Sequence, residues 1–159
     1  ERSQLPRPRW PGEPRGDEWR AWAGEVACWR LVARQGPAAV GRETAAVLAF
    51  MNIAPATEGH VLVIPKRHAR GILDIPDDDL RDVASVAKSI AARQVTQLGC
   101  AGVTLFQANE PAGWQSVFHF HIHVVPRSIG DPLVPPWRSE PVGLSALERV
   151  AQVLRQGDR

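Results

Sequence analysis

The sequence predicts an α+β fold, in which an antiparallel sheet of about five strands has two to three helices packed on it. The chain has 159 residues, of which 44% are apolar, and this suffices to bury the core of one domain. Short segments rich in β-branched and apolar residues are separated by short turns, which favours antiparallel pairing. A long segment in the middle of the chain has the three- and four-residue spacing of an amphipathic helix.

The N-terminal residues predict a flexible arm followed by a helix. Residues 1–17 contain four prolines and four arginines, a composition typical of a segment without a packed core. From Trp19 to Ala33, tryptophans and small apolar residues recur at helical spacing, and we interpret this stripe as core rather than as a ligand site. Gly36 and Pro37 end the helix. We therefore expect one domain over residues 18–159, with a C-terminal extension from about residue 131.

The other elements follow in order along the chain. The expected strands are 39–42, 45–52, 60–65, 103–109 and 115–125. The helix after the third strand begins at three acidic residues, 77–79, which complement the positive end of the helix dipole, and it ends at Gly99. Ser145–Glu148 has the sequence of a capping box and predicts a last short amphipathic helix.

Composition and charge exclude several classes of protein. The formal net charge is +2 and no segment is strongly basic, so we expect no nucleic-acid partner. The longest apolar runs, Ala45–Met51 and Val61–Pro65, are shorter than the ~20 residues of a membrane span, so we expect no membrane partner. The two cysteines, Cys28 and Cys100, form no CxxC pair, and the N-terminal segment has no hydrophobic signal core. We therefore expect a protein of the reducing cytoplasm.

Three of the five histidines lie at alternating positions: His119, His121 and His123. In a strand, such residues share one face. The residues between and beside them would enter the core from the other face: Phe118, Phe120, Ile122 and Val124. Three imidazoles on one face of so apolar a strand indicate a functional site rather than a structural one.

Two chemistries suit this row of histidines. The first is metal binding, since His-x-His on a strand can place two ring nitrogens on one ion. A carboxylate often completes such a site, and the nearest ones, Glu110 and Asp131, are nine and eight residues away. The second is nucleophilic attack on phosphorus, because imidazole has an ordinary pKa of about 6.5 and is largely neutral at pH 7. The amide and hydroxyl of Gln115 and Ser116 precede the row and are candidate donors to phosphate oxygens.

The motif resembles the one that names the histidine triad (HIT) superfamily. His119–Val125 alternates histidines with hydrophobic residues as that family does, and Asn109-Glu110 through Gln115-Ser116-Val117 resembles its approach to the triad. Phe50–Ile53 followed by His60–His68 resembles its pair of nucleoside-binding strands. The resemblance covers about residues 24–130 and implies a HIT-like fold.

The resemblance also implies a role for each matched histidine. His121 matches the nucleophile that forms a covalent nucleotidyl-histidine intermediate. His119 matches the residue whose main-chain carbonyl orients that nucleophile, and His123 matches a ligand of the α-phosphate. His60 matches a fourth histidine near the leaving-group atom.

The remaining matched positions imply substrate contacts. A base pocket is implied at Phe50, Ile53 and Leu62, and ribose binding at Asn52. Phosphate contacts are implied at Asn109, Gln115 and Ser116. From the residues alone, the apolar members are equally compatible with ordinary core, Asn52 with a turn residue and Ser116 with a strand-start hydroxyl. We interpret His68 as a surface or helix-start residue.

The expected function is that of a nucleotide hydrolase. It attacks the α-phosphate of a dinucleoside polyphosphate or a nucleoside phosphoramidate and releases a nucleoside monophosphate; a nucleotidyltransferase is less favoured. The alternatives are a nucleotide-binding or scaffold protein without turnover, and a metal-dependent hydrolase that uses the histidines as ligands. We expect no required cofactor, with Mg²⁺ accompanying a polyphosphate substrate at most, and a homodimer.

Two departures from the family pattern stand out. Some branches have a CxxC near the N-terminal helix that helps to hold zinc, whereas this chain has only Cys28 there, so we expect no structural zinc. Trp114 occupies a position that is commonly small in the family. An indole there is expected to reshape the leaving-group side of the site.

Overall fold

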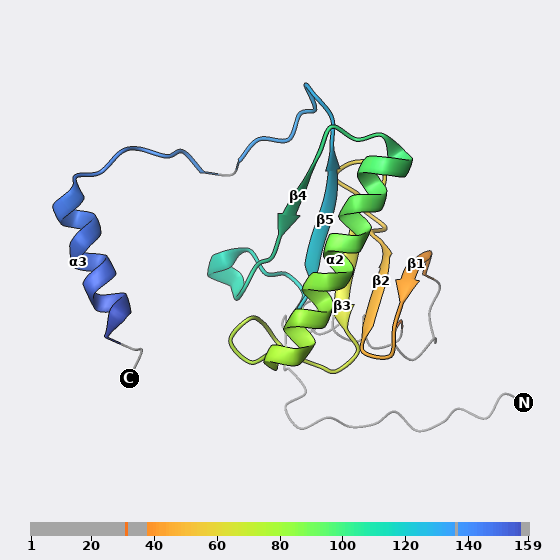
Figure 1. The fold of residues 1–159 in the computed structure, drawn as a ribbon, viewed down its shortest axis with the longest axis horizontal. Coiled ribbons are helices and arrows are strands. Elements are labelled where there is room, and N and C mark those ends of the chain that lie inside the picture. Colours follow the sequence, from red (N-terminus) through yellow and green to blue (C-terminus); the bar gives the residue numbers. More distant parts are fainter. Residues whose placement is uncertain (1–30, 32–37, 136, 157–159) are drawn as a thin grey trace, which may run out of the picture.

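A five-stranded antiparallel sheet with a long helix on one face forms the body of the protein (Figure 1). The computed structural model describes residues 31, 38–135 and 137–156. In them the strand order is β1-β2-β3-β5-β4. The strands are β1 (Val40–Glu43), β2 (Val47–Met51), β3 (Val61–Pro65), β4 (Gly102–Phe106) and β5 (Ile122–Arg127), and the helices are α2 (Asp77–Leu98) and α3 (Leu144–Arg155). The predicted α+β fold is confirmed.

Helix α2 covers one face of the sheet and forms the core with it. The helix contributes Val83, Val86, Ala87 and Ile90, and the sheet contributes Val47, Ala49, Val61, Val63 and Val124. The acidic first turn and the end at Gly99 are as predicted, and Gly99 has a φ of 68°, which a residue with a side chain rarely adopts. Val95 and Leu98, near the C-terminal end of the helix, are apolar but exposed.

Residues opposite one another in the strand ladder form a row across the other face of the sheet. Phe50 on β2 pairs with Leu62 on β3, Leu62 pairs with His123 on β5, and His123 pairs with Phe106 on β4. Directly paired residues of antiparallel strands project from the same face. This cross-strand row thus has Phe50 and Leu62 at its apolar end, His123 in the middle and Phe106 at its aromatic end. It lies on the face of the sheet that α2 leaves uncovered.

Three predicted boundaries were wrong. Strand β4 ends at Phe106, not at residue 109. Strand β5 begins at Ile122, not at residue 115, because the preceding segment is held by loop contacts: the N–H of Phe120 donates to the carbonyl of Ala69. The capping box is also wrong, since α3 begins at Leu144 after Gly143 and has no side-chain cap. Ser145 is already inside the helix and cannot act as its N-cap.

The apolar residues of the histidine segment behave largely as predicted. Phe120 and Val124 are fully buried, whereas Phe118 and Ile122 are partly buried. The guanidinium of Arg70 lies 4.0 Å above the ring of Phe118, which explains why this ring remains near the surface. The predicted arm over 1–17 and helix over 19–33 fall almost entirely outside the described residues.

The chain continues beyond the sheet into a separate helix. After β5, Arg127 and Asp131 form a bidentate ion pair, and a long connection leads to α3, which stands apart from the sheet in Figure 1. Its apolar residues are exposed: Leu144, Leu147, Val150, Val153 and Leu154. Within the described part of the chain, no helix is long and apolar enough to cross a membrane.

Candidate active site

Contacts with the main chain fix the ring of His121. Its Nδ1 lies 2.7 Å from the carbonyl oxygen of His119, and because a carbonyl can only accept, Nδ1 carries the proton. In the neutral ring, Nε2 then holds a lone pair. Burial lowers the pKa of His121 below its usual 6.5, although the bond to the His119 carbonyl opposes this shift. At neutral pH, His121 therefore has an unprotonated ring nitrogen suited to nucleophilic attack.

A hydrogen-bonded chain fixes the tautomer of His123. The N–H of Ala56 donates to Nδ1 of His60 at 3.1 Å, so His60 carries its proton on Nε2. That Nε2 lies 2.9 Å from Nδ1 of His123 and donates to it. His123 must then carry its own proton on Nε2. The ring centroids of His121 and His123 are 4.9 Å apart, so a ring with a free lone pair neighbours a ring with a free N–H.

These imidazoles are neutral because they are shielded from water. Burial, together with the neighbouring His121 and His60, lowers the pKa of His123 to about 4. Burial also lowers the pKa of His60. A charged ring at any of these positions would lose hydration and face other rings that are close enough to repel it.

The ring of His119 has a structural position rather than one facing His123. Its Nε2 donates to the carbonyl of Pro65 at 2.9 Å, so its Nδ1 accepts from Nδ1 of His68 at 3.0 Å. Burial lowers the pKa of His119 to about 4. His68 is exposed, as expected of a surface residue, but its contact with His119 was not anticipated, because it joins residues 51 positions apart in the sequence and has no local signal.

The expected base pocket is divided. Phe50 is buried and packs with Leu48 and Ile64, and the half-buried Leu62 lies beside them in the cross-strand row. Ile53 is 99% exposed and does not join this cluster. The row places Phe50 and Leu62 on the side of His123 opposite to Phe106.

Asn52 makes contacts within its own turn. Its Oδ1 accepts from the N–H of Ala54 at 3.0 Å, and its Nδ2 lies 3.4 Å from Nδ1 of His60. The contact with Ala54 is a bond within the turn, as expected if Asn52 is a turn residue. One amide proton and the second lone pair of Oδ1 have no partner among the described residues, and these groups suit a ribose hydroxyl.

The residues expected to contact phosphate differ in availability. Gln115 is buried and fully engaged: its Oε1 accepts from the N–H of Glu110, and its Nε2 donates to the carbonyls of Arg70 and Val117. Asn109 accepts from the N–H of Ile72 and from Gln107. Ser116 is exposed, and its hydroxyl has no partner in the described part of the chain. Gln115 and Asn109 thus hold the loops, while Ser116 is free to bind.

The loop before the histidines is strained at both ends. Glu110 has a φ of 58° and Trp114 a φ of 71°, and between them lies a short 3₁₀ turn, Pro111–Gly113. Such backbone costs about 1–3 kcal/mol for each residue with a side chain. The carbonyl of Glu110 accepts from the N–H groups of both Gly113 and Gln115, which holds the turn closed. Sequence patterns gave no sign of this conformation, because glycine is the usual residue where φ is positive.

A metal site has little support in this part of the protein. Within 31, 38–135 and 137–156, no group of three or more His, Cys, Asp or Glu side chains is close enough together to hold a metal ion. The nitrogens that His60 and His123 turn toward each other are used in a hydrogen bond. Cys28 lies outside the described residues.

Four buried or half-buried imidazoles, at His60, His119, His121 and His123, thus lie beside the apolar residues of the sheet. Residues 33–129 match the family model of the HIT domain, and the chain belongs to the HIT family.

Named relatives support this assignment. The adenosine 5'-monophosphoramidase of Schizosaccharomyces pombe is 32% identical over 104 residues, which are 65% of this chain and 68% of that protein. The crystal structure of a HIT family protein from Bacillus anthracis has a TM-score of 0.77 and 28% identity, and covers 84% of this chain and 96% of that one. A zinc-bound histidine triad protein from Mycobacterium smegmatis has a TM-score of 0.64 and 34% identity, and covers 84% of this chain and 94% of that one.

Proposed function

We propose that the protein is a nucleotide hydrolase that uses His121 as a covalent nucleophile. The observation that carries this proposal is the pair of fixed tautomers, which sets a lone pair on His121 beside an N–H on His123. Neutral imidazole attacks phosphorus, and a neighbouring donor stabilises the charge that builds up on the phosphate oxygens. The substrate is a nucleoside 5'-phosphoryl compound whose α-phosphate lies between these two rings.

In the first step, Nε2 of His121 forms a bond to phosphorus and the bond from phosphorus to the leaving group breaks. The leaving atom takes the bonding electrons and one proton. That proton is first taken up from solvent by the pair His60–His123 when an anionic phosphate binds beside it, because opposite charges favour the protonated form and raise the pKa of the pair. An amine leaving group departs neutral and a polyphosphate departs as an anion, and in both cases the nucleotide remains on His121.

In the second step, water attacks phosphorus and the bond between phosphorus and Nε2 breaks. The electrons return to Nε2, and the proton lost by water returns to the pair His60–His123. The products are a nucleoside monophosphate and the protonated leaving group. Since the phosphorus centre inverts twice, its configuration is retained overall.

Two leaving-group chemistries compete for this site. The named activity of the S. pombe relative favours a phosphoramidate, in which a P–N bond breaks. The second candidate is a dinucleoside polyphosphate, in which a P–O bond breaks; the aromatic end of the cross-strand row, at Phe106, favours a leaving group with an apolar part. The scheme needs no metal ion, although Mg²⁺ would neutralise a polyphosphate substrate.

We also propose that the protein assembles as a homodimer. The support is the exposed apolar face of α3, which makes no contact with the sheet and needs a partner surface. The M. smegmatis relative is zinc-bound, so zinc content belongs in the characterisation of this protein.

A substrate panel tests the proposed activity. Adenosine and guanosine phosphoramidates, diadenosine polyphosphates and adenosine 5'-phosphosulfate are offered to the protein, and chromatography measures the monophosphate released. Wild-type protein should release AMP or GMP from at least one class, and His121→Ala should not. Binding of AMP without any turnover would favour a nucleotide-binding protein instead.

A further inference from the structure

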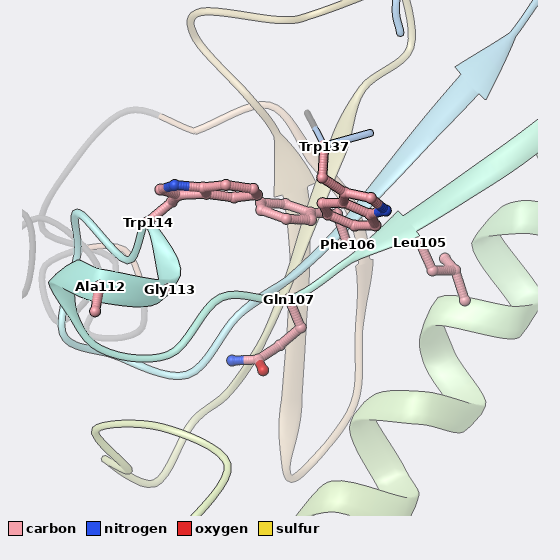
Figure 2. A pocket seen from close by; sticks show the side chains of 7 residues that line it. All are labelled: Leu105, Phe106, Gln107, Ala112, Gly113, Trp114 and Trp137. Carbon is pink, nitrogen blue, oxygen red and sulfur yellow. The ribbon is translucent and has the colours of Figure 1, made fainter. Parts of the chain in front are cut away.

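A row of aromatic rings continues outward from His123. The ring of Phe106 lies 5.4 Å from that of His123, the indole of Trp114 lies 6.4 Å from Phe106, and the indole of Trp137 lies 6.0 Å from Trp114. The last two pairs are nearly parallel, at 28° and 16°. Figure 2 shows the three side chains next to one another. These distances are those of stacked aromatic pairs.

Packing alone does not explain the position of Trp114. The residue has a left-handed backbone, which is unfavourable for any side chain, and yet its side chain is 54% exposed. A buried indole would recover the cost of the strain through the apolar area removed from water, but this one recovers only part of it. Strained backbone that packing does not explain is typical of binding sites.

The cross-strand row shows on which side of His123 the aromatic residues lie. Phe50 and Leu62 lie on one side of His123, and Phe106 lies on the other. With a nucleoside over the first side and a phosphate at His123, the part of the substrate beyond the phosphate has Phe106 and Trp114 as its neighbours on the other side. The aromatic cluster thus lies where the part of the substrate that departs must be held.

The groove at this cluster has the size and chemistry of a pocket for a flat ring. Its volume is about 380 Å³. Its lining contains no charged side chain, and besides the three aromatic residues it includes Leu105, Gln107 and the small residues Ala112 and Gly113. Such a lining offers a phosphate no charged side chain, but it stacks well on an aromatic ring.

We propose that Phe106, Trp114 and Trp137 bind a flat aromatic ring carried by the leaving group. This inference rests on the proposed hydrolase function and specifies its substrate class. The ring has two possible sources with the same chemistry: the second base of a dinucleoside polyphosphate, or the aryl group of an aromatic amine joined through a P–N bond.

Matched substrate pairs and matched variants test this inference. The first pair is adenosine 5'-phosphoro-tryptamidate and its butylamidate; the second is diadenosine tetraphosphate and adenosine tetraphosphate. Within each pair, only the first member has an aromatic ring in its leaving group. The variants are Trp114→Ala and Trp114→Phe. Both place a residue with a side chain at the same positive φ, but only the second keeps an aromatic ring.

In wild-type protein, kcat/KM for the aromatic member should exceed that for its partner in at least one pair. The ratio should fall by about 5- to 100-fold in Trp114→Ala, as expected when one stacked ring is lost, and Trp114→Phe should retain most of it. Trp137→Ala should lower the ratio as well. The pair in which the ratio falls identifies the source of the ring.

Equal ratios in wild type, Trp114→Ala and Trp114→Phe for both pairs would overturn the inference and leave the hydrolase proposal intact. The same comparison by calorimetric binding, in a His121→Ala background, does not depend on turnover. If no substrate is hydrolysed, the proposed function fails, while tighter binding of the aromatic members that depends on Trp114 would still support the ring site. Equal affinities within both pairs would overturn it.

Discussion

His60 is the residue whose replacement tests the tautomer chain most sharply. Its Nε2–H is the group that leaves His123 with its proton on Nε2, facing the substrate. In His60→Ala, Nδ1 of His123 loses this donor, and a proton on either nitrogen becomes nearly equal in energy. The bias that is lost equals one hydrogen bond, about 0.5–1.5 kcal/mol, so the productive tautomer falls to about half of the population and kcat should fall by at most about twofold.

Replacement of His123 should lower kcat more strongly than replacement of His60. His123→Ala removes the donor altogether, for which about 10²- to 10³-fold is expected. His60→Gln retains an N–H that can donate to His123 and should recover most of the loss. Nitrogen-15 NMR of labelled protein at pH 7 reads the tautomers directly: Nε2 of His123 should be protonated in wild type and a mixture in His60→Ala. A His60→Ala protein with unchanged kcat and an unchanged His123 tautomer would refute the reasoning.

The remaining predictions concern the sugar, pH and metal. Asn52→Ala should weaken ribonucleotide binding by about 5- to 150-fold, since one or two hydrogen bonds are lost, and affect 2',3'-dideoxy analogues much less; equal losses would mean that Asn52 only shapes its turn. Because the pKa of His121 is lowered, kcat/KM should fall on acidification with a midpoint below 6.5, and a midpoint above 6.5 would contradict the burial argument. His119 and His123 have pKa values of about 4 in the folded state and about 6.5 when unfolded, so the unfolded chain binds more protons between these values. The free energy of unfolding, measured with urea, should therefore decrease as pH falls from about 6.5 to about 4, and a flat profile would count against buried neutral rings. Exhaustive chelation should leave phosphoramidate hydrolysis intact; stoichiometric zinc whose removal abolishes activity would favour a metal-dependent hydrolase.

Local patterns predicted the parts of the fold that depend on local physics. Strands β2 and β3 are short apolar runs bounded by turns, and α2 has acidic residues at its start and Gly99 at its end. The start of β5 was not predictable in this way, because the hydrogen bond from Phe120 to Ala69 joins segments far apart in the chain. The capping box failed because its motif does not state which residue is the first to adopt helical backbone angles.

The site was predictable in its residue types and less so in its contacts. The alternating histidines indicated imidazole chemistry, and the structure brings His60, His121 and His123 together. The contact between His68 and His119 and the aromatic neighbours of His123 depend on tertiary packing. Gln115 was expected to contact phosphate, but its side chain is used inside the protein. An amide next to the triad is also the group that a strained loop needs to satisfy its N–H and carbonyl groups.

A search for the covalent intermediate is the most direct test of the central claim. The protein is mixed with an adenosine phosphoramidate, quenched within the first turnover at alkaline pH, where a phosphorylated imidazole survives, and digested for mass spectrometry. The proposed mechanism predicts an adenylyl group on His121, absent from His121→Ala, which should also lose about 10⁴-fold or more in turnover. Wild-type turnover without any adduct, or a His121→Ala protein that retains more than about a tenth of the activity, would contradict it.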